Sequence, residues 1–331
     1  ELCAFEQLPE DNIAGFDNPP RPDTGYFRQA LLDGLSLQRA QGVNPYTIGV
    51  IASTDTHLGT PGAADEDRFL GHGGAGTPAA EEVPAGLPDK LEYNPGGLAV
   101  VWAEENTRGA VFDALKRRET YATSGPRIIS RFFGGAELDS ALCSSADPVA
   151  AAYAQGVPMG GTLSGDEVSQ GISFLAMATQ DSGTANGDGV PLQRLQLVKG
   201  WLDESGQQRE TVVDVAGSAD NGAAVDTRSC ATSGAGHADL CTVWRDPDFD
   251  PAAPAFYYLR VLENPSCRWS QRLCVAAAVD CAAPETIKPG YAACCSAEHR
   301  PVIQEPPGPR RSGTSPSLLF AGRLATQAQW C

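Results

Sequence analysis

The sequence contains no run of about 18 apolar residues, so it predicts no membrane-spanning helix. Positive charge is also scarce. Lysine and arginine together number 24 against 41 acidic residues, which gives a formal net charge of −17. Such a chain repels polyanions, so we predict no nucleic-acid partner. Lysine itself is rare, and its positions are Lys90, Lys116, Lys199 and Lys288.

Paired C-x-x-C motifs, the usual signature of zinc sites, are absent. Ten cysteines are nevertheless present, and eight of them lie between Cys230 and Cys331. Oxidised pairs in a secreted or periplasmic protein explain this distribution better than metal binding does, although the spacing does not show which cysteines pair. The chain begins at Glu1 without the apolar stretch of a signal peptide, so this predicted location depends on the cysteines alone.

Residues 1–135 have the pattern of an α/β domain. The spacing of apolar residues predicts a helix over Thr24–Gln41 and a second helix from about Thr107 to Arg118. Two aliphatic segments, Thr47–Ala52 and Leu98–Ala103, have the composition of buried strands. Alternating strands and helices predict an α/β layer with parallel strands.

The rest of the chain has a different pattern. Residues 136–165 are rich in Ser, Ala, Gly and Pro, and we predict a linker. Short strands separated by turn residues predict an antiparallel β-sandwich over residues 166–331, with a cysteine-rich, irregular tail from Cys267. The predicted strands are Ile172–Thr179, Leu192–Leu202, Thr211–Val215, Leu240–Arg245 and Phe256–Leu262.

The polar string Ser53–His57 directly follows the first aliphatic segment. If the extended conformation continues, Asp55 and His57 project to the same side, because strand side chains alternate. A carboxylate and an imidazole placed in this way can reach one divalent ion or two neighbouring ions, and α/β proteins place active sites at strand ends. We therefore predict both residues as metal ligands. D-x-H alone is a weak signal, since a surface Asp and His often share a loop.

Longer stretches of the sequence resemble one family. The strings NPYTIGVIASTDTHLGTPGA, NPGGLAVVWAEENTRGAVFDALKRRETYATSGPRI and YYLRVLENPSCRW are similar to the family known as domain of unknown function 3604, a relative of the PHP superfamily of hydrolases. The resemblance is near-continuous over residues 44–135. It is patchy but ordered over residues 157–330, where it includes LQLVKGWLDESG and VWRDPDFDP.

The resemblance implies a distorted β/α barrel, of which this chain holds the C-terminal portion. In that superfamily, ligands at strand ends hold two or three divalent transition-metal ions: zinc, manganese or iron. The usual reaction is hydrolysis of a phosphate ester, in which a metal-activated water attacks phosphorus. Asp55 and His57 match the last ligand pair. The first motif, H-x-H, has no counterpart here, which implies that an N-terminal portion of the domain is missing.

Three further residues are candidates for the site. His72 lies in a glycine-rich stretch, and we predict it as a further ligand or a proton donor. Glu104 and its neighbour Glu105 follow the strand predicted at Leu98–Ala103, and Glu104 is predicted as a ligand or general base. The alternative is that both acids stabilise the start of the next helix. Arg127 follows a turn and is predicted to hold a substrate anion.

The leading prediction is therefore a metal-dependent hydrolase of the phosphoesterase type with a small anionic substrate. One alternative is a non-catalytic module for binding or assembly, with an incomplete metal site. Another is a metallohydrolase that acts on a non-phosphate bond, because a fold does not fix its reaction. The Asp55–His57 pair favours catalysis, whereas the absent H-x-H motif favours the non-catalytic alternative.

Overall fold

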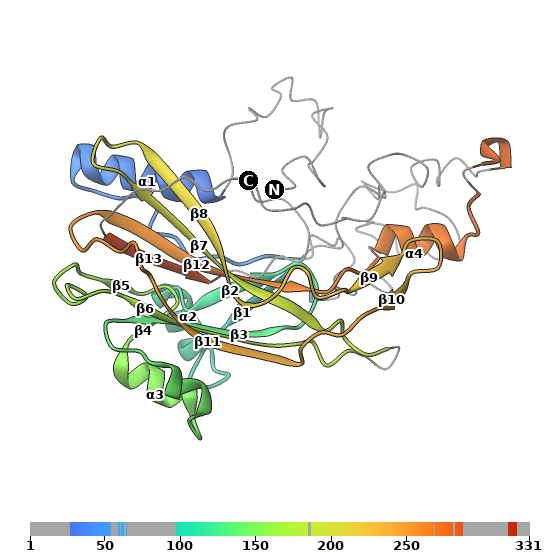
Figure 1. The fold of residues 1–331 in the computed structure, drawn as a ribbon, viewed down its shortest axis with the longest axis horizontal. Helices are drawn as coiled ribbons and strands as arrows, with labels where there is room; N and C mark the ends of the chain where they lie inside the picture. The colour runs from blue at the N-terminus through green and yellow to red at the C-terminus, as the bar shows by residue number, and fades with distance from the viewer. Residues whose placement is uncertain are drawn as a thin grey trace.

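The structure, a computed structural model, has four layers (Figure 1). Helix α1 (Phe27–Gln41) covers a five-stranded sheet, which packs face to face on a four-stranded sheet. The outer face of the four-stranded sheet is covered by a 3₁₀ helix, η1 (Ser140–Ser144), and helix α3 (Pro148–Gln155). The residues that the structure describes are 27–53, 59, 61–62, 64, 97–184, 187–267, 269–280, 282–286 and 317–322.

Two antiparallel sheets form the centre of the protein. Only one of their strand pairs, β12 with β13, is parallel among the residues described. The order in the four-stranded sheet is β11 (Asp239–Arg245), β6 (Ser173–Thr179), β3 (Ile129–Gly135) and β4 (Val157–Pro158). The order in the five-stranded sheet is β5 (Thr162–Leu163), β13 (Ser317–Gly322), β12 (Pro254–Glu263), β7 (Leu192–Leu202) and β8 (Gln208–Gly217). All five strands predicted for the second half of the chain are therefore confirmed.

The alternation of side chains along these strands fills both faces of each sheet. On β7, Leu195, Leu197 and Trp201 point into the core between the sheets, whereas Val198 and Leu202 contact α1. Strand β6 alternates in the same way, with Phe174 in the core between the sheets. Both sheets thus bury apolar side chains on their two faces, which explains why the sequence shows nearly continuous apolar runs there.

Helix α1 confirms the helix predicted at Thr24–Gln41, although Thr24 lies outside the described residues. Phe27, Leu31 and Leu35 are buried against the five-stranded sheet. Gly42 follows the helix with a φ of +77°, a conformation in which glycine is favoured as a C-cap.

Residues 136–165, where we predicted a linker, contain η1, α3, β4 and β5. A disulfide between Cys143 and Cys241 joins η1 to β11. The elements of this segment are short and are separated by Ser, Gly and Pro residues, so the sequence showed no sustained periodicity.

The β1–β2 pair lies beside the sandwich. We predicted parallel strands, but β1 (Leu98–Val101) pairs with β2 (Thr120–Thr123), a strand that the sequence analysis did not predict, and this pair is antiparallel. The connecting helix α2 (Arg108–Arg117) confirms the second predicted helix, and the Thr107 side chain accepts a hydrogen bond from the backbone of Ala110. No sheet closes into a barrel within the described part of the chain.

The segment 47–53, predicted as a buried strand, is not assigned as a strand. It runs beside β2 and in the same direction, because its contacts advance in step along both. The guanidinium of Arg118 donates a hydrogen bond to the carbonyl oxygen of Thr47. The hydroxyl of Thr120 donates one to the carbonyl oxygen of Val50. Side chains make these contacts in place of the regular backbone ladder of a strand.

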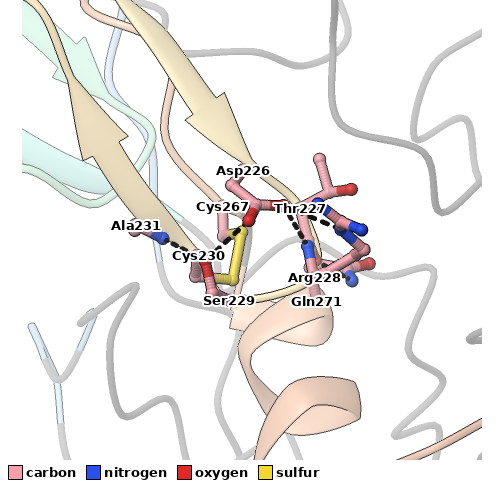
Figure 2. Close-up of a disulfide and its surroundings, with 8 residues drawn as sticks. All are labelled: Asp226, Thr227, Arg228, Ser229, Cys230, Ala231, Cys267 and Gln271. Atoms are coloured by element: carbon pink, nitrogen blue, oxygen red, sulfur yellow. Dashed lines mark hydrogen bonds and ion pairs between the residues drawn. A yellow bond between two sulfur atoms is a disulfide. The ribbon is translucent and has the colours of Figure 1, made fainter.

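A second disulfide, Cys230–Cys267, joins the turn of a small hairpin to the chain just before a short helix (Figure 2). The hairpin consists of β9 (Ala224–Asp226) and β10 (Ala231–Ser233), and the helix is α4 (Trp269–Ala276). The 3₁₀ helix η2 (Pro284–Thr286) follows α4 in the sequence.

No described helix is both long and apolar enough to cross a bilayer.

Candidate functional site

The predicted ligands Asp55, His57 and His72 lie outside the described residues. Residues before this stretch are placed. The carbonyl oxygen of Ser53, two positions before Asp55, accepts a hydrogen bond of 2.7 Å from the backbone of Gly97. A Cβ atom at Gly97 would collide with Thr123, so glycine permits this close approach. Ser53 is therefore held next to the end of β2.

Arg127 lies beside the residues that follow the same stretch. Its guanidinium donates to the carbonyl oxygen of Gly62 at 3.3 Å and to that of Ala64 at 3.5 Å. Arg127 itself is exposed, whereas Ala64 is fully buried. Ser53 and Gly62, which precede and follow the stretch with Asp55 and His57 in the sequence, thus both lie near the turn after β2.

That turn is fixed by a buried tyrosine. The hydroxyl of Tyr121 donates to the carbonyl oxygen of Ile128 at 3.0 Å and accepts from the backbone of Ser130 at 3.3 Å. Burial raises the pKa of Tyr121 to about 12, although the hydrogen bond from Ser130 and the charge of Arg131 lower it. The hydroxyl therefore stays protonated at neutral pH and keeps both contacts.

A buried carboxylate holds the turn from the other side. Asp181 is only 8% exposed. Its oxygens accept from the backbone of Arg127 at 2.6 Å and from the backbone of Gly183 at 2.8 Å. These two hydrogen bonds connect the turn after β2 to the glycine-rich loop after β6. They also position the backbone from which the Arg127 side chain extends.

An open cleft lies between these loops, with an empty volume of about 500 Å³ that includes solvent. Four glycines, at positions 125, 183, 187 and 189, contribute to its walls. The charged residues that line it are Arg127, Asp181, Asp188, Glu263 and Arg272. A cleft with small residues and a few charged groups suits a compact, polar ligand.

Helix α4 brings Arg272 to the cleft, and Figure 2 shows how the start of this helix is held. The disulfide between Cys230 and Cys267 fixes the chain just before α4. The amide of Gln271 donates to the carbonyl oxygen of Thr227 at 2.8 Å. The disulfide and this hydrogen bond connect α4 to the hairpin of β9 and β10.

Glu104 lies at the other end of the β1–β2 pair. Leu98 pairs with Thr123, near Arg127, whereas Val101 pairs with Thr120 at the far end. Glu104 is exposed and follows β1 at that far end. The sequence analysis named Glu104 as a candidate because it follows a predicted strand, and Arg127 because it follows a turn. The antiparallel pairing separates them by the length of the strand.

A polar cluster near that far end is satisfied internally. Glu119 is 4% exposed, and its carboxylate contacts the hydroxyl of Tyr153 and the guanidinium of Arg131. The Arg131 guanidinium stacks 3.3 Å from the ring centre of Trp102. Each polar group here has a partner within the cluster, so its role is structural.

Sequence reasoning did not find Asp181, Glu263 or Arg272. Asp181 begins a glycine-rich string, DSGTANGDG, whose composition fits a simple turn as well as a functional loop. Arg272 lies between two cysteines of the tail that we predicted to be irregular. Only the fold brings these residues next to Arg127.

The described residues include no group of three or more His, Cys, Asp or Glu side chains that could hold a metal ion. The predicted ligand pair, a carboxylate and an imidazole, is a donor set that suits zinc, manganese or iron.

The fold defines a class: a four-layer protein with helices packed on two antiparallel sheets, and with a charged cleft lined by the loops after β2 and β6. Comparison of the sequence with protein families gives the specific assignment. The chain belongs to the protein family of unknown function DUF3604, whose profile matches residues 1–289. No curated protein and no solved structure matches the chain.

Proposed function

We propose that this protein is a metal-dependent hydrolase that acts on small phosphate esters. In this proposal Asp55 and His57 bind the metal ion, and Arg127 binds the substrate anion. The observation that carries it is the position of Arg127. Its guanidinium contacts Gly62 and Ala64, just after the D-x-H string, while Ser53, just before the string, lies against Gly97.

The charges of the cleft support the need for a cation. Three carboxylates face two guanidinium groups there, and the whole chain carries a net charge of −17. An anionic substrate is repelled by such a surface unless a positive ion lies beside it. A bound divalent metal supplies that charge, polarises the phosphoryl oxygens and makes a bound water more acidic.

The chain's own residues orient the substrate. Tyr121 and Asp181 fix the turn that carries Arg127, so its guanidinium is held by the fold before a ligand arrives. An arginine offers paired N–H donors to two oxygens of a phosphate. His72 remains a proposed ligand or proton donor. Glu104 has no part in the proposal, because it lies at the other end of the β1–β2 pair.

The proposed location is outside the cytoplasm. Cys143–Cys241 and Cys230–Cys267 are disulfides, and Cys274 is also disulfide-bonded. Bonds of this kind form and persist in secreted and periplasmic proteins. A metal-dependent hydrolase in that location would meet substrates from the periplasm or the medium.

Metal content and turnover test the proposal. The intact protein, purified without chelator, should contain stoichiometric zinc, manganese or iron by elemental analysis and should hydrolyse an aryl phosphate. The Asp55→Ala/His57→Ala variant should lose both the metal and the activity while its circular dichroism is unchanged. A metal-free wild-type protein that cannot be reloaded would rule out the hydrolase.

Arg127→Ala separates anion binding from metal binding. The metal content should stay at the wild-type level, while KM for the aryl phosphate rises about tenfold because a charge-assisted hydrogen bond is lost. Arg108→Ala is the matched control, since Arg108 is an exposed arginine at the start of α2. Equal effects of the two substitutions would remove Arg127 from the site.

A further inference from the structure

A lysine and an aspartate are buried together between the two sheets. Lys199 lies in the middle of β7, and Asp246 directly follows β11. The Nζ atom of Lys199 is 2.6 Å from Oδ2 of Asp246. Their side chains are only 5% and 3% exposed. Both groups are thus almost fully removed from water, and each comes from a different sheet.

Aromatic side chains surround the pair. The Nζ atom lies 5.1 Å from the ring centre of Trp201 and 5.6 Å from that of Tyr257. It also donates to the carbonyl oxygen of Asp248 at 3.0 Å. Charged groups carry a high free-energy cost in such a low-dielectric environment. Within the pair, transfer of one proton from the ammonium to the carboxylate gives a neutral amine beside a neutral carboxylic acid.

Tyr257 adds a proton donor to the same oxygen. It is the residue of β12 that pairs with Lys199 of β7, and its hydroxyl donates to Oδ2 of Asp246. Burial raises the pKa of Tyr257 well above its usual value, and the Asp246 carboxylate raises it further. The phenol therefore stays protonated. A hydrogen bond to a carboxyl oxygen draws electrons from the carboxyl carbon, and it helps that oxygen to leave as water.

A nucleophile, a carboxyl group and a proton donor are thus held together by three strands of two sheets. Fixing two reactants in this way replaces a bimolecular encounter and gives effective concentrations on the order of 10⁵ M or more when they are well oriented. We propose that Lys199 and Asp246 form an intramolecular amide bond after folding. This bond would be a covalent link between β7 and the end of β11.

The reaction is a condensation and needs no other reactant. The lone pair of the neutral Nζ attacks Cγ of the protonated Asp246 side chain, and a C–N bond forms. The C–O bond to Oδ2 breaks, and this oxygen leaves as water. Its two hydrogens are the acid proton and one proton from the amine, which Tyr257 can relay through its hydroxyl. The product is a neutral secondary amide plus one water molecule.

The link would complete the attachment of an edge strand. Strand β11 lies at the edge of the four-stranded sheet, and Cys241 within it is already bonded to Cys143. The amide would hold the other end of β11 through Asp246. Unlike the disulfide, it would survive reduction. An exported protein gains lasting protection of an edge strand from such a bond.

Intact mass spectrometry tests the proposal directly. After full reduction and alkylation of the cysteines, the wild-type chain should be lighter than its sequence mass by one water molecule. Lys199→Met and Asp246→Ala should each have the mass that their sequences predict, and this readout does not require that the variants fold. Lys116→Met, an exposed lysine on α2, is the control and should keep the deficit.

Peptide mapping should then show one cross-linked pair of peptides that contains Lys199 and Asp246. Tyr257→Phe keeps the ring but removes the hydroxyl, so the purified variant should be a mixture of linked and unlinked chains. A wild-type mass equal to the sequence mass would overturn the proposal and leave the pair as a buried salt bridge. A deficit that persists in Lys199→Met would overturn it as well.

Discussion

The sandwich and the segment before the candidate site are stabilised in different ways. Strands β7 and β12 pair over nine positions and bury apolar side chains on both faces. By contrast, segment 47–53 forms no strand in the structure, and Ile51 within it is 56% exposed. The sandwich thus provides a rigid frame, whereas the candidate ligands follow a segment with few stabilising contacts. Functional loops on rigid frames commonly have this arrangement.

The largest effect should come from the core between the sheets. Phe174 is fully buried, and its ring centre lies 4.4 Å from that of Tyr257 and 5.5 Å from that of Phe132. Phe174→Ala should lower the free energy of unfolding by roughly 3–5 kcal/mol, because it removes apolar contacts and leaves a cavity. Urea denaturation followed by fluorescence would measure the change.

The matched control for this substitution is Phe112→Ala, since Phe112 on α2 is 59% exposed. Its effect should stay within about 0.5 kcal/mol. Similar losses of unfolding free energy for the two substitutions would contradict the distinction between a rigid sandwich and the less stabilised region beside it.

The two disulfides should differ in what they stabilise. Cys143–Cys241 closes 98 residues and joins the layer of η1 to the sandwich. Its replacement by a pair of alanines should cost the sandwich roughly 2–4 kcal/mol. Cys230–Cys267 closes only 37 residues and holds the start of α4. Replacing it should loosen α4 and weaken the Arg272 side of the cleft, with a smaller change in global stability.

Hydrogen exchange would distinguish these results. Loss of Cys230–Cys267 should speed the exchange of α4 amides and leave β7 and β12 protected. If the amides of β7 and β12 exchanged faster to the same extent, α4 would belong to the same cooperative unit as the sandwich.

Sequence patterns predicted the sandwich better than they predicted the site. Strands such as β7 combine apolar runs with turn residues on both sides, and their boundaries match because burial on both faces fixes the composition. The pairing of β1 with β2 was not predictable in this way. Residues Leu98–Ala103 indicate a strand but carry no information on its partner, so the sequence could not show that Glu104 and Arg127 lie at opposite ends of the β1–β2 pair. Asp181 accepts a hydrogen bond from the backbone of Arg127, which is 54 residues away in the sequence, so sequence patterns did not indicate this contact.

The turn that carries Arg127 should respond to high pH. The pKa of Tyr121 is raised to about 12 in the folded protein from a usual value near 10. Between these two values the unfolded chain loses the tyrosine proton while the folded protein keeps it. Stability should therefore fall as the pH rises from about 10 to 12, by roughly 2–3 kcal/mol for this group. Below pH 10 the contribution is fully present.

Tyr121→Phe should reduce the slope of the unfolding free energy against pH, between pH 10 and 12, by the equivalent of about one proton. Urea denaturation across this pH range would measure the slope. An unchanged slope would show that Tyr121 titrates normally and does not clamp the turn.

The smallest effect should come from the cap of α2. Thr107 accepts a hydrogen bond of 3.3 Å from Ala110, and Ala114 is the only residue of α2 that is buried. Thr107→Ala should therefore destabilise the helix by about 1 kcal/mol. Faster hydrogen exchange limited to α2 would confirm that it unfolds apart from the sandwich, whereas faster exchange throughout the sheets would contradict this.

A double-mutant cycle tests the proposal that Arg127 and Asp55 serve one site. Binding of inorganic phosphate in the presence of manganese(II) is measured by calorimetry for the wild type, Asp55→Ala, Arg127→Ala and the double variant. If a metal ion held by Asp55 and the Arg127 guanidinium bind the same anion, the double variant should lose clearly less than the sum of the single losses. Losses that add within about 0.5 kcal/mol would show that the two residues belong to separate sites.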